Sequence, residues 1–395
     1  MHANPSSQPP RILFATIAAG GAHVSSAEAM IEALEHFYPG EFQLELREIM
    51  PEYGFAALDK QHKESWRWML AKPWTVNLGE RIIGRFPRLT LHAQRRSLRP
   101  FARIAAQRLR AQPPALIVAN HAWLTIALTM SQRAYGLQVP VLSFQTQTLT
   151  SSALWAEPDA ERMVLGSPLA KKMLVDFGMP ADSIDVVGYP VKRAFVEAPS
   201  QAQARQHLGL EPHFTCLIAL GGEGAGHDPE AIVTTLRQLA FPLQMVVICG
   251  RNKALQTRLE TLAASVPELH VRGFVNNMAD YIAACDVLIG KTSSATTFET
   301  LAVGRPSIAT NRPFLSEGRF VDFLLERNLG AFAPDQDALA TTVSDYYHHP
   351  EKLEQVAKRA QAFNFPHMRQ QLAHYLAHYA HTGQPDLSRC GAGIH

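Results

Sequence analysis

Short apolar runs alternate along the chain with longer segments in which apolar residues recur every three or four positions. Short runs are typical of buried strands, and the longer spacing is typical of helices that cover a sheet. In the first half this pattern predicts a helix at about 25–37 and strands at 12–17, 43–48, 115–119, 140–144, 162–165 and 184–187. Such alternation favours a parallel sheet with helices on both faces.

The same alternation starts again in the second half of the chain. It predicts helices at 295–303 and 366–382 and strands at 215–220, 244–249, 268–271 and 286–289. A polar stretch at 197–203 separates the halves, so we expect two doubly wound α/β domains in tandem rather than one large sheet. Ligands bind such sheets at the carboxyl ends of the strands, so the loops that follow the strands are the expected functional edge.

Composition favours a folded protein without a membrane-spanning helix. The 395 residues are 47% apolar and 18% charged, and no apolar run approaches the roughly 20 residues that a spanning helix needs. Cys216, Cys249, Cys285 and Cys390 form no CxxC pair, and three of them fall in apolar runs, so we expect reduced core thiols and a cytoplasmic location. The run 12–22 lacks a usual cleavage site, so we interpret it as a strand and a turn rather than a signal peptide.

One segment of the sequence is strongly basic. Residues 61–110 contain twelve Lys and Arg but two acids, a net charge of +10, which leaves −8 for the rest of the chain. Trp66, Trp68 and Trp74 lie among these cations. Such a segment suits an anionic membrane surface, because tryptophan prefers the bilayer interface. A nucleic acid and a merely solvated face are the alternatives, but no nucleic-acid-binding module is recognisable, and we favour the membrane.

Three features have the residue types that chemistry on a phosphorylated substrate needs. Glycines crowd the turn 221–226, where backbone amides suit phosphate, although such turns also serve close packing. His23 begins a helix after another glycine-rich turn and is either a general base or a packing residue there. Glu299 lies one turn inside a helix that starts after Lys291, and a carboxylate in this position suits the two hydroxyls of a ribose.

Other common chemistries lack their motifs. No GxGxxG follows residue 12 and no P-loop motif occurs, which argues against ordinary dehydrogenases and ATPases. His374 and His378 lie one helical turn apart, but no nearby carboxylate or cysteine completes a site, so we expect no metal there.

Several motifs in this order match a known family. The strongest are Gly221-Gly222-Glu223-Gly224-Ala225-Gly226, the run 247–253, Val271-Arg272-Gly273-Phe274 with Met278, and the spacing Lys291…Thr296…Glu299…Gly304…Pro306. With them the chain resembles, over about residues 11–380, the lipid-glycosylating GT-B glycosyltransferases. These are the monogalactosyldiacylglycerol synthases and the processive diacylglycerol glucosyltransferases, with the enzyme that adds N-acetylglucosamine to lipid I as a more distant relative.

The resemblance implies an α/β protein with two Rossmann-like domains that face a central cleft. Residues 1–195, joined by a C-terminal helix at 366–385, would bind the acceptor and the membrane, and residues 200–365 would bind a UDP-sugar, UDP-glucose or UDP-galactose. His23 would deprotonate the hydroxyl of a membrane lipid, diacylglycerol, in an inverting transfer that forms a β-glycolipid. The resemblance implies no obligatory metal or other cofactor, and a peripheral position on the inner face of the cell membrane.

The resemblance also assigns residues to each ligand. Gly222, Glu223 and Gly224 would lie by the donor pyrophosphate, Arg251 and Phe274 would border the uracil, and Glu299 would hold the ribose. The further donor-binding positions are Gly273, Met278, Lys291, Ser294, Ala295, Thr296, Glu317, Gly318 and Arg319. The acceptor and membrane positions are Gly21, Ala22, Trp66, Trp68, Trp74, Arg95 and Arg96.

The chain departs from the family pattern in three places. The acid of the Asp-Thr-Gly-Gly-Gly-His turn is replaced by Ala18, and 291–296 lacks the family's glycines. Leu315, Ser316 and Arg319 stand where the family has Gln, Glu and Asn. We therefore expect uridine recognition to be kept and sugar recognition to be changed, with an acidic sugar facing Arg312 or Arg319 as one hypothesis. A soluble aglycone as acceptor, or an inactive nucleotide- or lipid-binding homologue, is the alternative function.

Overall fold

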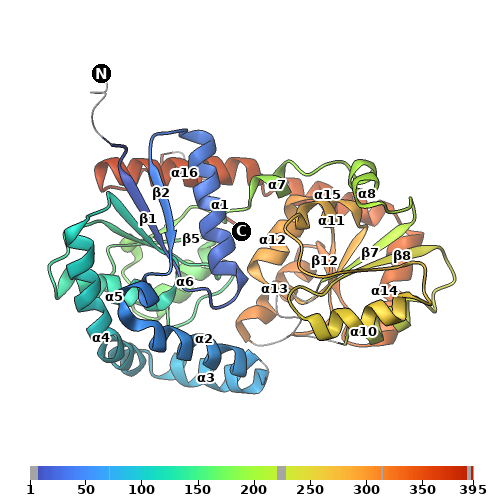
Figure 1. The fold of residues 1–395 in the computed structure, drawn as a ribbon, viewed down its shortest axis with the longest axis horizontal. Helices are drawn as coiled ribbons and strands as arrows, with labels where there is room; N and C mark the ends of the chain where they lie inside the picture. Colours follow the sequence, from blue (N-terminus) through green and yellow to red (C-terminus); the bar gives the residue numbers. More distant parts are fainter. Residues whose placement is uncertain (1–7, 71, 220–227, 313–314, 389–392, 395) are drawn as a thin grey trace. The chain divides into compact units, whose positions relative to one another are not determined.

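The computed structural model of the protein describes residues 8–70, 72–219, 228–312, 315–388 and 393–394. It divides the chain into two compact units. The N-terminal unit consists of residues 1–192 and 366–395, and the C-terminal unit of residues 193–365. Each unit is built on one parallel six-stranded sheet flanked by helices (Figure 1), which confirms the predicted α/β class.

The sheet of the N-terminal unit has the order β2-β1-β3-β4-β5-β6. Its strands are β1 (Arg11–Ala15), β2 (Gln43–Arg47), β3 (Leu116–Ala119), β4 (Val141–Phe144), β5 (Arg162–Leu165) and β6 (Ile184–Val186). Its helices are α1 (Gly21–Phe37), α2 (Ala56–Leu70), α3 (Pro73–Arg85), α4 (Pro87–Ala111), α5 (Ala122–Arg133), α6 (Pro168–Asp176) and the returning α16 (Phe365–Thr382), with short turns of helix at Pro51–Phe55 and Ala181–Ser183. Every strand predicted in this half is present within two residues of its expected bounds.

Side chains alternate between two cores on the two faces of this sheet, as the pleat of a strand requires. Leu13 and Ala15 of β1 pack in a cluster with α4 and α5. Ile12 and Phe14 face the other way and pack with α1 and α16. The last helix of the chain therefore completes the core of the first unit, where Tyr375 also donates a hydrogen bond of 2.6 Å from its hydroxyl to Asp185.

The basic segment forms three consecutive helices, α2, α3 and α4. Pro73 and Pro87 are the first residues of α3 and α4. Proline suits this position because the backbone N–H that it lacks would have no acceptor within the helix. The second half of α4 is buried against the sheet and α5. The other helical faces leave large apolar side chains exposed to solvent: Trp68, Trp74, Leu78, Ile82, Phe86 and Leu89. Few apolar side chains elsewhere in the described chain are as exposed.

Two of the arginines assigned to the acceptor and membrane surface have different surroundings. Arg96 is exposed on α4. Arg95 donates from Nε to the fully buried Glu157 at 2.9 Å and from Nη2 to Asp159 at 2.6 Å. Its charge is therefore balanced within the protein, because a buried carboxylate needs a cation beside it.

The sheet of the C-terminal unit has the order β12-β11-β10-β7-β8-β9. Its strands are β7 (Phe214–Ala219), β8 (Leu243–Ile248), β9 (Leu269–Arg272), β10 (Val287–Gly290), β11 (Ser307–Ala309) and β12 (Gly330–Phe332). Its helices are α7 (Arg193–Val196), α8 (Gln201–Leu208), α9 (Pro229–Leu236), α10 (Lys253–Ala263), α11 (Met278–Ala284), α12 (Ser294–Ala302), α13 (Leu315–Glu326), α14 (Gln336–His348) and α15 (Glu351–Gln361). The sequence pattern missed β11 and β12, because three residues are too few to show a period.

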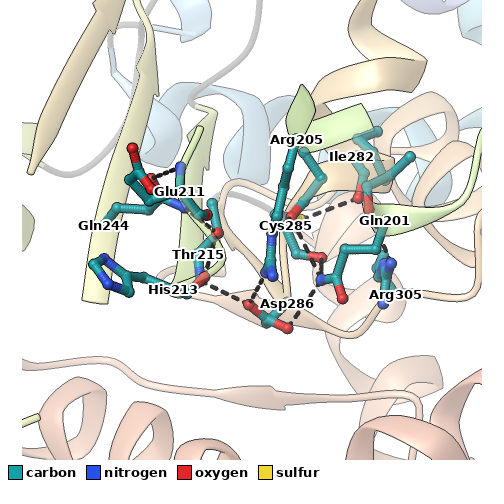
Figure 2. Close-up of polar contacts among 12 residues, drawn as sticks. Gln201, Arg205, Glu211, His213, Thr215, Gln244, Ile282, Cys285, Asp286 and Arg305 are labelled. Carbon is teal, nitrogen blue, oxygen red and sulfur yellow. Dashed lines mark hydrogen bonds and ion pairs between the residues drawn. The ribbon is translucent and has the colours of Figure 1, made fainter. Parts of the chain in front are cut away.

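Polar side chains form hydrogen bonds and an ion pair at the amino ends of these strands. Asp286, just before β10, accepts from the backbone N–H of Thr215 at 2.6 Å, from Arg205 at 2.7 Å and from Gln201 at 2.9 Å (Figure 2). Gln244 of β8 donates to the Thr215 hydroxyl at 2.9 Å. These contacts fix α8 at the edge of the sheet opposite to the carboxyl ends of the strands, and the carboxyl edge carries the predicted donor residues.

Two sequence predictions concern the chain as a whole. Cys216, Cys249 and Cys285 are buried and unpaired, which confirms core thiols, and burial raises the pKa of the Cys285 thiol to about 12. Cys390 lies outside the described residues. None of the helices in the described part of the chain combines the length and the hydropathy that spanning a bilayer requires.

Candidate functional site

His23 lies where the first strand of the N-terminal unit passes into α1. The turn between them needs glycine at residue 20, whose φ of +94° lies in the left-handed region that other residues rarely adopt. Helix α1 begins at the next residue, Gly21, so His23 lies in its first turn together with Ala22. Ala22, which stands where the resembled family has a third glycine, is the second residue of this regular helix.

The ring of His23 is held by residues that follow two neighbouring strands. His23 Nδ1 lies 2.7 Å from the backbone oxygen of Asn120, after β3, and 3.3 Å from the hydroxyl of Thr146, after β4. The Asn120 side chain donates to Ser26 Oγ at 3.0 Å and to the backbone oxygen of His23. Because β1, β3 and β4 are adjacent in the sheet, these loops meet at one carboxyl edge.

This contact determines which nitrogen of His23 is basic. A carbonyl oxygen accepts only, so Nδ1 carries the proton, and in the neutral ring Nε2 keeps its lone pair. Loss of water around the ring lowers the pKa of His23 to about 4, the hydrogen bond to Asn120 opposes this shift, and the charge of His62 adds to it. His23 is therefore a neutral imidazole at physiological pH, with Nε2 available to take up a proton.

Aromatic rings surround this histidine. The ring centre of His121 lies 4.8 Å from that of His23, and the ring centre of Trp155 lies 6.3 Å away. Trp66 of α2 brings its indole nitrogen within 4.0 Å of the Cβ position at Gly20. Trp66 thus lies beside the turn that precedes His23, whereas Trp68 and Trp74 point to solvent.

Sequence reasoning singled out His23 and missed its neighbours. Asn120, His121, Thr146 and Trp155 were not candidates, and neither was His62. The signal that could have found Asn120 and His121 is their position directly after a buried strand, at the edge where ligands bind such sheets.

In the C-terminal unit, the residues predicted to border a uracil do lie together. Arg251 follows β8 and Phe274 follows β9, and the guanidinium carbon lies 4.5 Å from the ring centre of Phe274. The Phe274 ring is 60% exposed, so one face of a cation–aromatic pair is open to a flat ligand. Gly273 packs against Gln256, and Met278 begins α11.

The helix start at residues 291–296 also lies at the carboxyl edge. Gly290 ends β10 so close to β7 that an added Cβ would lie 2.2 Å from the backbone oxygen of Ala219. Ser293 caps α12, because its hydroxyl accepts from the backbone N–H of Thr296. Ser294 is buried in the first turn of α12, and Lys291, Ala295, Thr296 and Glu299 are half-buried around it. This is the arrangement of a helix N-terminus that suits a phosphate.

The segment expected to contact the sugar is described in part. Gly318 and Arg319 lie in α13, and nothing is described of the side chain of Glu317. Arg312 and Arg319 both form ion pairs with Asp322. The two guanidinium groups share the single negative charge of Asp322, and Arg319 also lies 3.8 Å from Glu326. The acidic sugar stays a prediction.

Two further predictions concern phosphate and metal. Gly222, Glu223 and Gly224 lie outside the described residues. Within the described residues, no three His, Cys, Asp or Glu side chains are grouped so that they could hold a metal ion.

Comparison with known proteins identifies similar sequences over most of the chain. The model of the glycosyltransferase family 28 C-terminal domain matches residues 215–372. Monogalactosyldiacylglycerol synthase 1 of Arabidopsis thaliana is 26% identical over 361 residues, which cover 86% of this chain and 65% of that protein. The probable synthase of Nicotiana tabacum is also 26% identical, with the same coverage. The chain therefore spans about two-thirds of the length of these relatives.

Similar solved structures share the fold at low identity. MurG of Acinetobacter baumannii superposes with a TM-score of 0.60 at 13% identity, covering 94% of this chain and 100% of its own. HepE of Anabaena, solved in complex with UDP-glucose, gives a TM-score of 0.55 at 15% identity, covering 93% and 100%. A UDP-GlcNAc 2-epimerase of Neisseria meningitidis gives 0.60 at 10% identity, covering 95% and 99%. Since that fold also serves an epimerase, the fold by itself does not determine the reaction.

Proposed function

We propose that the chain is a GT-B glycosyltransferase of the monogalactosyldiacylglycerol synthase type and that it acts as an inverting, UDP-sugar-dependent hexosyltransferase. UDP-glucose or UDP-galactose is the donor, and diacylglycerol in a membrane is the acceptor that the names of the relatives suggest. The product is a β-glycolipid. The observation that carries the proposal is the neutral His23, oriented at the carboxyl edge of its sheet with Nε2 unprotonated.

In the proposed reaction His23 acts as the general base. As the acceptor hydroxyl approaches the anomeric carbon, His23 Nε2 takes the hydroxyl proton, and the oxygen forms its bond to that carbon. The bond between the anomeric carbon and the phosphate oxygen breaks on the opposite face, and UDP leaves with both electrons. A single displacement from the opposite face inverts the configuration, so an α-linked donor gives a β-linked product.

The C-terminal unit supplies the proposed donor site. Arg251 and Phe274 stack against the uracil, and Glu299 accepts hydrogen bonds from the ribose hydroxyls. Backbone N–H groups at the start of α12 face the diphosphate and stabilise the charge of the leaving UDP. Gly222, Glu223 and Gly224 would contribute further amides. No step of this scheme calls for a metal ion.

The exposed face of α2, α3 and α4 is the proposed membrane-docking surface. Trp68 and Trp74 are 55% and 64% exposed, and further exposed apolar residues lie on the same three helices. The segment 61–110 has a net charge of +10, although Arg95 and Lys63 are paired with acids outside it. Apolar side chains that project among cations suit the interface of an anionic bilayer, such as the inner face of the cell membrane. A peripheral enzyme bound in this way would meet its lipid acceptor in the plane of the membrane.

A donor screen tests the proposal. Purified protein is mixed with diacylglycerol in anionic liposomes and offered UDP-glucose, UDP-galactose, UDP-N-acetylglucosamine and UDP-glucuronate separately. We expect a β-glycolipid from UDP-glucose or UDP-galactose, identified by mass spectrometry and by the anomeric proton coupling in NMR. UDP binding without any glycolipid from the four donors would overturn the lipid acceptor, and a parallel incubation with soluble aromatic aglycones would then test the alternative acceptor.

A further inference from the structure

Three histidines of the N-terminal unit lie in a row, and the proposed reaction uses only the first. The ring centres of His23 on α1 and His121, before α5, are 4.8 Å apart. His121 Nε2 lies 3.3 Å from Nε2 of His62, which α2 supplies. The ring centres of His62 and Trp123 are 4.0 Å apart. His62 and His121 are separated by 59 positions in the sequence, and the rings of both nevertheless lie in one cluster with His23.

Hydrogen bonding assigns the protons along this row. His121 caps α5, and its Nδ1 accepts from the backbone N–H of Trp123 at 3.2 Å. A neutral imidazole whose Nδ1 accepts must carry its proton on Nε2. That Nε2–H therefore donates to His62 Nε2, and neutral His62 carries its own proton on Nδ1. For each of the three histidines, only one tautomer is compatible with the hydrogen bonds to its neighbours.

We propose that His62 is a positioning residue for the base: as a neutral acceptor it holds His121 in the Nε2–H tautomer, and His121 with Asn120 keeps the His23 ring oriented. Two contacts transmit the effect. The His121 ring packs on the His23 ring, and Asn120, the preceding residue, accepts the His23 Nδ1–H. This inference rests on the proposed function, because it takes His23 as the base.

The arrangement works only while His62 is neutral. A proton on His62 Nε2 would face the Nε2–H of His121, and His121 could accept it only by moving its own proton to Nδ1. That tautomer would lose the hydrogen bond from Trp123 that caps α5. Protonation of His62 therefore breaks either the hydrogen bond between His62 and His121 or the one from the Trp123 N–H to His121. Both bonds are made by His121, the residue after Asn120.

Charged groups around His62 act in both directions. Burial lowers the pKa of His62, Asp59 on the same helix raises it, and Lys63 lowers it. Lys63 is itself paired with Asp59 at 2.7 Å and with Glu48. From the other packed elements His62 faces the neutral His121 and His23, and burial keeps the pKa of both low. Since His62 is only half-buried, it is the member of the row that takes up a proton first as the pH falls.

Two variants separate this role from simple packing. His62→Gln keeps a side-chain oxygen that can accept from His121 but cannot be protonated, and His62→Leu keeps bulk against Trp123 without an acceptor. With the glycolipid assay, we expect His62→Gln to retain kcat within about twofold at pH 8 and to shift the acidic limb of the pH profile to lower pH. We expect His62→Leu to lose about tenfold in kcat at every pH, with an unchanged KM for the UDP-sugar.

The matched control is His36→Gln, an exposed histidine on α1 of the same unit and outside the proposed docking surface, which we expect to leave the profile unchanged. Equal losses in His62→Gln and His62→Leu, or an acidic limb that does not move in His62→Gln, would show that His62 only packs, and the inference would be wrong.

A second readout does not depend on transfer. Nitrogen-15 shifts of the histidine rings in the free protein report the tautomers, and we expect Nδ1–H for His23 and Nε2–H for His121. His62→Gln should keep both signals, and His62→Leu should mix the tautomers of His121. If the tautomers are as expected but the protein transfers no sugar, the proposed function is wrong and the inferred hydrogen bonding of the three histidines is supported. If the protein is active but His121 carries its proton on Nδ1, the positioning role inferred for His62 is wrong.

Discussion

His23 combines two properties: its hydrogen bond fixes the tautomer of the ring, and its surroundings lower its pKa. The Asn120 carbonyl determines the tautomer, and loss of water determines the basicity. The hydrogen bond alone would raise the pKa, so burial is the larger effect. A base of this kind is unprotonated before the acceptor arrives and gains a proton only as the transition state forms.

The first prediction concerns this residue. His23→Ala removes the proton acceptor, and we expect kcat for glycolipid formation to fall at least about 100-fold. UDP affinity, measured by calorimetry, should stay within twofold of wild type, because the proposed donor residues belong to the C-terminal unit. His36→Ala, an exposed histidine on the same helix, is the control and should keep full turnover. Full turnover in His23→Ala would remove the base assignment.

The same pKa predicts how stability depends on pH. The pKa of His23 is about 4 in the folded protein, below the usual 6.5 of an unfolded chain, so between these pH values the unfolded chain binds a proton that the folded chain does not. The free energy of unfolding should therefore fall as the pH falls from 6.5 to 4. Urea unfolding at several pH values should give a shallower fall in His23→Ala than in wild type.

Glu299 is the residue on which the proposed ribose contact depends. Glu299→Gln keeps the shape but removes the charge, and we expect UDP to bind about tenfold more weakly, or by about 1.4 kcal/mol. Glu268→Gln, an exposed acid of the same unit, should leave UDP affinity unchanged. Calorimetric UDP affinity equal to that of wild type in Glu299→Gln would place the ribose elsewhere.

At the scale of elements, the basic segment forms α2, α3 and α4, and its residues have two different surroundings. Some lie near the turn that contains His23, and others are exposed to solvent. Trp66 and His62 of α2 face the surroundings of His23, whereas Trp68 and Trp74 project to solvent with other apolar residues. Arg95 holds the buried Glu157, so not every cation of the segment is available to a lipid. The membrane surface and the base are therefore served by different faces of the same helices.

We predict that the double variant Trp68→Ala with Trp74→Ala binds anionic vesicles at least about tenfold more weakly than wild type in a flotation assay. UDP affinity should not change. Leu325→Ala, an exposed apolar residue of α13 in the other unit, is the matched control and should bind vesicles like wild type. If the double variant floats with vesicles as wild type does, the docking surface is not this one.

At the scale of the whole molecule, the chain returns at its end to the unit in which it began. Tyr375 and Tyr379 of α16 are buried among α1 and the first sheet, and their hydroxyls donate to Asp185 and Glu161. The C-terminal unit, by contrast, is one continuous segment, residues 193–365. The two units therefore depend differently on the last helix.

We predict that truncation after Phe365 abolishes folding of the N-terminal unit, because it leaves the apolar face of α1 and one face of the sheet uncovered. The C-terminal unit should stay folded. Amide NMR spectra of the truncated chain should show dispersed signals only for residues 193–365, and a fully dispersed spectrum would contradict the expected role of α16.

The sequence alone determined the α/β class, the six strands of the first sheet and four of the six strands of the second, and it predicted the carboxyl edge as the functional one. A buried strand is a short apolar run, and a helix that covers a sheet has apolar residues every three or four positions. Both patterns lie within one segment of the sequence, so they can be recognised without knowing which elements pack together. His23, Arg251, Phe274 and Glu299 follow predicted strands, and this position marked them as candidates before any contact was known.

Only the tertiary structure decided which of these loops meet. His23, Asn120 and Thr146 come together because β1, β3 and β4 are adjacent, and strand order leaves no trace in the pattern of a single strand. The same holds for His62, which helix α2 brings to His121. A side chain's tautomer and pKa follow from partners distant in sequence, so the sequence identified the candidate base, and the fold determined its chemistry.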